Sequence, residues 1–170
     1  MTSEGQHHHL VGRRRAPLSR ADRLRRAVNL ATLATPAGLL LARLGGARLR
    51  PGPRGTLVAA GYRSRLLAPR AAAITVGDVI LLRLDDDRLA RRPGLLDHEA
   101  EHAAQWACGL GMLGFPLLYG LASAWSWLRF GDAALGNPFE RRAGLVTGGY
   151  LPAGAALPTP RRLAARLRRP

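Results

Sequence analysis

The chain has no lysine, so all 26 of its basic side chains are arginines. Its single cysteine, Cys108, excludes an internal disulfide framework and is more typical of a reducing compartment. Aromatic residues make up only 5% of the chain, too few to predict a platform on which nucleic-acid bases stack. Zinc-finger cysteine pairs and a basic region followed by heptads are also lacking, so we expect no specific nucleic-acid partner.

Acidic residues are scarce as well: 11 of the 170 residues are Asp or Glu, which leaves a net charge of +15. The many Arg, Ala, Gly, Leu and Pro residues are typical of a GC-rich genome, and this bias weakens the charge as evidence for a polyanionic partner. A basic surface nevertheless attracts anionic membranes. The N-terminus is polar and Arg-rich rather than apolar, unlike a secretory signal. We therefore expect a cytoplasmic protein, with attachment to a membrane surface left open.

One uncharged stretch, Trp106 to Leu128, has the length that a membrane-spanning helix needs, about 20 residues. Arg129 follows it, and Trp125 and Trp127 resemble the aromatic belt of a membrane interface. Several glycines and Pro116 interrupt the stretch near its start. We therefore predict a loop over residues 109–116 and a buried helix over 117–129 that supports the functional site.

The remaining patterns predict an α+β domain over residues 19–150, between a disordered basic N-terminus (1–18) and a Pro/Arg-rich tail (151–170). Ser19 begins a helix whose apolar side carries Leu24, Val28, Leu30 and Ala31. Thr35-Pro36 kinks the chain into a second helix that ends at Gly45-Gly46. These two helices form a predicted N-terminal helical hairpin.

A small antiparallel β-sheet is expected next. Residues 51–55 read as a linker and residues 56–62 as a strand, and residues 72–76 and 79–83 form a hairpin around Gly77-Asp78. An active-site helix follows, from Pro93 at its first position to Gly109. Two supporting helices complete the prediction, over residues 117–129 and from Asn137-Pro138 to Gly148-Gly149.

Histidine is the most informative residue type. Outside the run His7–His9, His98 and His102 are the only histidines, and they bound the pentapeptide His-Glu-Ala-Glu-His. Residues four apart share one face of a helix, so the two imidazoles converge on one metal ion. Glu99 follows the first histidine and can reach water activated by that metal. The pattern predicts a Zn²⁺ site with Glu99 as the catalytic base.

A catalytic zinc needs a third protein ligand and an open position for water. Glu140, in the helix that Asn137-Pro138 begins, is the best candidate. Asp97 points away from the histidine face, and Asp132 sits in a glycine-flanked turn, so both are poorer choices. Hydrolysis of an amide also requires a donor for the developing oxyanion. The sequence does not choose among four candidates, Tyr119, Tyr150, Arg141 and Arg142.

Three sequence segments resemble the gluzincin-type zinc metallopeptidases, in particular small bacterial minigluzincin domains of unknown function. They are the hairpin AAAITVGDVILL, the motif LLDHEAEHAAQW and the downstream helix NPFERRAG. The resemblance covers roughly residues 71–150. It implies zinc ligation by His98, His102 and Glu140, with Glu99 as base, and hydrolysis of a peptide or protein substrate. Gly144 departs from the family, which often has an aspartate there to support a histidine ligand.

Other interpretations stay open at this stage. The two histidines also fit ordinary polar positions on a partly buried helix, and Glu140 fits an acidic residue that the dipole favours in the first turn of a helix. Gln105 is expected to be a capping or core residue. The alternative function is a non-catalytic basic domain that binds a membrane surface or a protein partner through its Arg-rich ends.

Overall fold

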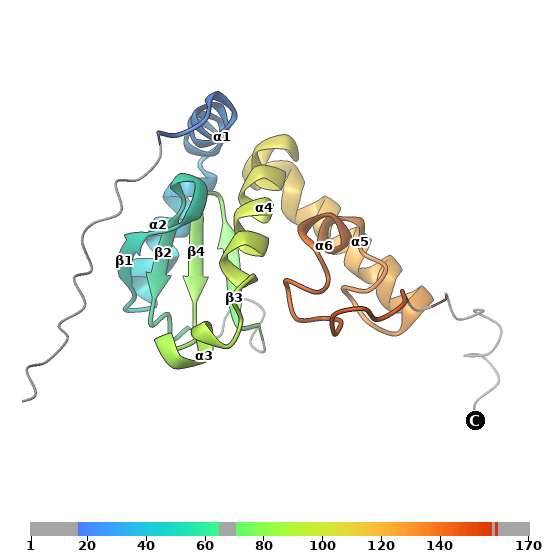
Figure 1. Cartoon of the computed structure of the whole chain (residues 1–170). Helices are drawn as coiled ribbons and strands as arrows, with labels where there is room; N and C mark the ends of the chain where they lie inside the picture. Colours follow the sequence, from blue (N-terminus) through green and yellow to red (C-terminus); the bar gives the residue numbers. More distant parts are fainter. Residues whose placement is uncertain (1–16, 65–70, 158, 160–170) are drawn as a thin grey trace, which may run out of the picture.

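The computed structural model describes residues 17–64, 71–157 and 159 (Figure 1). The predicted disordered N-terminus with His7–His9 falls outside the described residues up to position 16, and so does the tail from 160 onwards. The described ranges form an α+β fold, as predicted. Its elements are α1 (Arg20–Ala31), α2 (Ala34–Leu44), β1 (Arg48–Pro51), a 3₁₀ turn (Pro53–Gly55), β2 (Leu57–Ala60), β3 (Ala73–Val76), β4 (Val79–Leu82), α3 (Asp86–Ala90), α4 (Leu95–Cys108), α5 (Gly111–Phe130) and α6 (Pro138–Ala143).

The four strands form a mixed sheet in the order β1-β2-β4-β3. The predicted hairpin is confirmed, with Val76 opposite Val79. The prediction of a wholly antiparallel sheet is wrong, because β2 and β4 run parallel, with Val58 opposite Ile80. All four residues of β4 are buried, as expected for a central strand covered on both faces. The hairpin pattern alone does not reveal which of its strands pairs with β2.

Strand β1 is not predicted by the sequence, in which Pro51 to Gly55 read as a linker. It pairs antiparallel with β2 at the edge of the sheet. Its two arginines and its terminal Pro51 are typical of an edge strand, because charged side chains and proline keep an edge from pairing further. They also hide the alternation by which a strand is recognised in a sequence.

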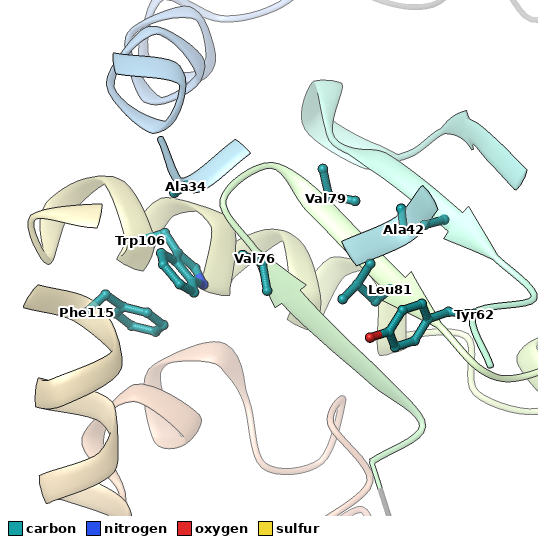
Figure 2. Packing of buried hydrophobic residues seen from close by; sticks show 9 residues of the cluster. Ala34, Ala42, Tyr62, Val76, Val79, Leu81, Trp106 and Phe115 are labelled. Atoms are coloured by element: carbon teal, nitrogen blue, oxygen red, sulfur yellow. The ribbon is translucent and has the colours of Figure 1, made fainter. Parts of the chain in front are cut away.

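Side chains alternate along β4 between two apolar clusters, one on each face of the sheet. Val79 and Leu81 belong to the larger cluster, which α2, α4 and α5 complete (Figure 2). Ile80 and Leu82 face the smaller one, with Leu95 at the start of α4. Helix α2 approaches the sheet closely, since a Cβ at Gly38 would lie 2.4 Å from the Val76 carbonyl oxygen. The core thus fixes α4 against the edge strand β3.

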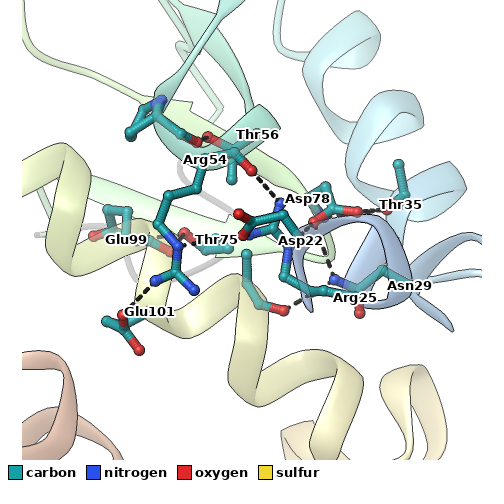
Figure 3. A network of polar contacts seen from close by, with 12 residues as sticks. Asp22, Arg25, Asn29, Thr35, Arg54, Thr56, Thr75, Asp78, Glu99 and Glu101 are labelled. Carbon is teal, nitrogen blue, oxygen red and sulfur yellow. Dashed lines mark hydrogen bonds and ion pairs between the residues drawn. The ribbon is translucent and has the colours of Figure 1, made fainter. Parts of the chain in front are cut away.

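Helix α1 turns its polar side inward, contrary to the prediction that Leu24, Leu30 and their neighbours face the core. Arg25 is buried and donates to Asp22 at 2.9 Å and to Asp78 at 2.8 Å (Figure 3). Asn29 donates to Asp78 at 3.2 Å and to the Ala103 carbonyl of α4 at 2.9 Å. These contacts tie α1 to the hairpin turn and to α4. The apolar side of the helix consequently faces outward.

The region after α4 also differs from the prediction. Helix α5 begins at Gly111, so the predicted loop over 109–116 reduces to a tight elbow around Leu110. Pro116 lies inside the helix, where it removes one backbone hydrogen bond in the second turn. The helix is largely exposed rather than buried, and only its residues Gly111, Phe115 and Ser126 are buried.

Two helix boundaries shift as well. Helix α4 begins at Leu95 rather than at Pro93, and α6 ends at Ala143 rather than near Gly148. Among the described residues, no single helix combines the length and the apolar character needed to cross a membrane. Two bent pairs meet that test only when joined, α1 with α2 across a 73° bend and α4 with α5 across a 116° bend.

Candidate metal centre

Three ligand-type side chains meet in the interior between α4 and α6. His98 and His102 lie one turn apart on α4, and their Nε2 atoms are 3.1 Å apart. Glu140 of α6 places Oε2 at 3.2 Å from Nε2 of His98 and Oε1 at 3.4 Å from Nε2 of His102. All three side chains are buried, and their ligand atoms lie within 4.8 Å of one another. The structure therefore brings together the three residues predicted as ligands.

Helix α6 is short, and its first residues fix the position of Glu140. The Asn137 side chain accepts from the Phe139 amide at 2.9 Å and donates to Ser123 of α5 at 3.0 Å. Pro138 supplies a preformed φ angle at the first helical position. Phe139 packs edge-on against Phe115 of α5. The Asn-Pro start thus anchors α6 to α5 and directs the carboxylate of Glu140 toward α4.

The other ring nitrogen of each histidine faces an oxygen that accepts a hydrogen bond. Nδ1 of His98 lies 3.0 Å from the Gly144 carbonyl oxygen, and Nδ1 of His102 lies 2.8 Å from Oε1 of Gln105. The Gln105 amide orientation follows from its Nε2 group, which donates to the Phe139 carbonyl at 2.9 Å. Because both acceptors are oxygens without a proton, each Nδ1 carries the hydrogen. Each Nε2 is left with a lone pair directed at the cluster, the tautomer of a metal ligand.

The lone pairs and the spacing of these ligand atoms suit a bound cation. Two Nε2 lone pairs face each other at 3.1 Å, and among the described residues the buried Oε2 atom of Glu140 has no hydrogen-bond partner. Buried polar atoms are rarely left in this state without an ion or water. Ligand atoms about 2.0–2.1 Å from a tetrahedral zinc ion lie about 3.3 Å from one another. The observed separations of 3.1, 3.2 and 3.4 Å are close to that spacing, so the cluster could hold a metal ion.

The electrostatics of the cluster favour a positive charge at the same place. Burial by itself raises the pKa of Glu140, but the adjacent imidazoles of His102 and His98 outweigh it and hold that pKa well below its usual range. Burial lowers the pKa of His102, but the adjacent Glu140 carboxylate raises it overall. The carboxylate therefore stays ionised and attracts either a proton or a metal ion to the histidines.

Glu99 lies beside the cluster and is held by the edge strand. Its side chain is 5% exposed, and its Oε2 accepts the Thr75 hydroxyl at 2.6 Å (Figure 3). Burial raises the pKa of Glu99 above its ordinary value. A carboxylate whose pKa lies closer to neutrality is better matched to taking up and releasing a proton. Sequence reasoning missed Thr75, because nothing in the strand pattern indicates which side chain faces the motif helix.

The four candidate oxyanion donors lie in different places. The Tyr119 hydroxyl of α5 donates to Oε1 of Glu140, so it orients a ligand. Tyr150 packs its ring against His98, with centroids 6.0 Å apart, and remains 44% exposed. Burial and the negative charge of Glu140 raise the pKa of Tyr150, so its hydroxyl keeps its proton at neutral pH. Arg141 and Arg142 are exposed on α6, and in the described part of the chain no hydrogen bond or ion pair joins either to the cluster.

The segment after α6 closes over His98. Gly144, at φ 103°, turns its carbonyl onto Nδ1 of His98 and thereby does what an aspartate often does in the family resembled. A Cβ at Gly148 would lie 2.6 Å from Cε1 of His98, so only glycine fits there without displacing the ring. The departure at Gly144 therefore does not leave this histidine without support. The sequence could not show this, because the acceptor is a backbone atom.

Gln105 offers a test of the support for His102. The substitution Gln105→Met keeps a similar volume and removes the acceptor for Nδ1, so we expect zinc affinity to fall about 10- to 100-fold. Competition with a chromophoric chelator measures this change. Glu101→Gln is the control, because Glu101 lies on the same helix but pairs outward with Arg54. Equal affinities in Gln105→Met and the unsubstituted chain would show that this hydrogen bond does not orient the ligand.

Comparison of the chain with models of protein families, with curated proteins and with solved structures finds no match. The resemblance to gluzincin-type peptidases therefore stays a prediction from three sequence segments. The feature of the chain that points to a function is the geometry of His98, His102 and Glu140.

Proposed function

We propose that this chain is a zinc-dependent hydrolase that cleaves a peptide or another amide bond. The observation that carries the proposal is the buried cluster itself, in which two Nε2 lone pairs and an unpartnered carboxylate oxygen converge. Two imidazoles and one carboxylate form a ligand set used by zinc hydrolases, and imidazole suits zinc better than it suits magnesium or calcium. A buried ion pair without a metal would not require both histidines to present a lone pair to the same point.

The chain supplies a base at the appropriate place. A zinc ion bound at the cluster would polarise water and lower its pKa to near 7. Glu99 follows His98 in the same helical turn, and its raised pKa suits the uptake of a proton from that water and its delivery to the leaving amine. The Thr75 hydroxyl restrains one oxygen of Glu99 and so fixes the direction of the carboxylate.

Tyr150 is the best-placed donor for the developing oxyanion. It lies next to a ligand histidine, is partly exposed to an incoming substrate, and keeps its hydroxyl proton at neutral pH. Tyr119 is a positioning residue, because its hydroxyl donates to the ligand Glu140.

A peptide is the substrate class that the fold favours. Strand β3 is the edge strand on the α4 side of the sheet, and an extended peptide can add to such an edge through backbone hydrogen bonds. One carbonyl of β3, that of Thr75, already accepts the Trp106 indole at 2.8 Å, so a bound peptide would pair with the remaining groups.

Exposure of the purified zinc-loaded chain to a complex peptide mixture, with products identified by mass spectrometry, tests the proposal. We expect new cleavage products that disappear after chelation and return when zinc is restored. A zinc-loaded chain that generates no products, or products that persist after the metal has been removed, would contradict a zinc-dependent peptidase.

A further inference from the structure

Helix α5 exposes large apolar side chains along its whole length. They recur every three or four residues and share one face of the helix, opposite to Phe115, Tyr119 and Ser126. We call them the outer stripe: Leu113, Leu117, Leu121, Trp125 and Leu128. Leu113 is 91% exposed, and each of the others is close to half exposed or more. Contiguous apolar surface of this kind marks a site of contact with a partner or a membrane.

Two more exposed leucines lie near the start of the outer stripe. Leu33 at the α1–α2 elbow and Leu110 at the α4–α5 elbow both have left-handed backbone conformations, at φ 60° and 63°, and both are well exposed. The two elbows touch, because a Cβ at Gly111 would lie 2.2 Å from Oγ1 of Thr32. A left-handed conformation is unfavourable for leucine. Two strained leucines thus project from adjacent turns at one end of α5.

The helices that carry this surface expose arginine but no carboxylate. Within the described residues, the one acidic residue of α1, α2 and α5 is Asp22, which is buried against Arg25. Exposed arginines on these helices include Arg20, Arg23 and Arg26 of α1 and Arg129 of α5. Most exposed carboxylates belong instead to α3 and the start of α4, at the opposite end of the molecule from α1 in Figure 1. Exposed carboxylates are therefore concentrated away from α1.

A pocket of about 270 Å³ lies on this basic side. Arg23, Arg26 and Leu30 line it, and so do Thr35 of α2, Leu57 of β2 and Asp78 of the hairpin turn. At the far end of α5, Trp125 precedes Arg129 by one turn. Indole and guanidinium groups next to apolar side chains are typical of the boundary between lipid headgroups and acyl chains.

We infer that the outer stripe and the two elbows dock on the surface of an anionic lipid bilayer. The leucines enter the boundary between headgroups and acyl chains, and the exposed arginines of α1 and α5 contact lipid phosphates. A second copy of the chain is a poorer occupant, because each copy would bring several arginines, whereas Asp132, the exposed carboxylate just after α5, already accepts from the Ala134 and Leu135 amides. Docking of this kind needs no membrane-spanning helix. It also extends beyond the proposed hydrolase, because it does not depend on zinc.

Sedimentation of the full-length chain with vesicles tests this inference, with phosphatidylcholine alone and with a phosphatidylcholine–phosphatidylglycerol mixture. We expect binding to the anionic vesicles and at least about tenfold weaker binding for the triple variant Leu113→Gln, Leu117→Gln, Leu121→Gln, whose leucines no longer enter the membrane. Leu49→Gln, at an exposed leucine of β1, is the control for the loss of an apolar side chain and should bind normally. Circular dichroism and thermal unfolding verify that the variants fold.

A second pair of variants tests the role of charge. Arg23→Gln with Arg26→Gln should weaken binding several-fold, whereas Arg91→Gln with Arg92→Gln, which removes the same charge from exposed positions near α3, should not. Equal binding by the leucine variant and the unsubstituted chain would overturn the inference. The Arg-rich ends alone would then account for binding to the vesicles. A dimer that the leucine variant dissociates, without binding to anionic vesicles, would also overturn it and would assign the stripe to self-association.

Discussion

Substitution of Glu99 by glutamine is expected to lower hydrolysis about 100- to 10,000-fold while zinc stays bound. Glutamine preserves the shape of the side chain and its hydrogen bond with Thr75, but it cannot accept a proton from water at neutral pH. The ligand atoms of His98, His102 and Glu140 are unaffected, so the metal content should not change. The measurement compares zinc content and the rate of peptide cleavage in the same preparation.

Glu101→Gln is the matched control for this experiment. Glu101 lies two residues further along α4, is half-buried, and pairs with Arg54 of the 3₁₀ turn (Figure 3). Its substitution removes the same charge from the same helix and should leave the rate of cleavage unchanged. Undiminished cleavage by Glu99→Gln would show that another group removes the proton, and loss of zinc from this variant would show that Glu99 supports the ligands instead.

The second large effect is expected at Glu140. The substitution Glu140→Gln removes the one carboxylate of the ligand set, so zinc affinity should fall by more than the roughly 10- to 100-fold that loss of an outer hydrogen-bond partner costs. Two imidazoles alone would then hold the metal. Titration against a chelator of known affinity measures the loss. Tyr119→Phe, which removes the hydroxyl that orients Glu140, should show the smaller effect.

Asp97→Asn is the control for the charge of Glu140, because Asp97 is an exposed carboxylate next to His98 that takes no part in the cluster. Zinc affinity should be unchanged in that variant. Thermal unfolding of the metal-free proteins separates the loss of a ligand from damage to the fold. If Glu140→Gln binds zinc as tightly as the unsubstituted chain, the third ligand has been assigned wrongly.

The three ligands could be predicted from the sequence, because their residue types and spacing are visible there. His98 and His102 need only the helical spacing of four residues, and Glu140 stands out because the chain has so few glutamates. The hydrogen-bond acceptors that orient the two histidines were harder to predict. Gln105 lies three residues after His102 on the same helical face, which is a usable signal, but the Gly144 carbonyl is a backbone atom whose position depends on how α6 ends.

The packing of α1 and α5 could not be predicted, for a common physical reason. A helical pattern indicates two faces, and the usual assumption is that the apolar face is buried. In α1 the buried face is polar, because Arg25 and Asn29 find partners in Asp78 and the Ala103 carbonyl. In α5, small and aromatic residues make the inward contacts and the leucines remain outside. In both helices, contacts with distant segments decide which face is buried, and a sequence pattern does not contain them.

The most direct measurement is the zinc content of the purified full-length chain, compared with that of His102→Ala. The cluster of two imidazoles and one carboxylate predicts about one zinc ion per chain, and almost none when His102 is replaced, because two ligands do not complete the site. An unsubstituted chain that takes up no zinc, or a variant that holds as much as the unsubstituted chain, would contradict a metal centre at His98, His102 and Glu140.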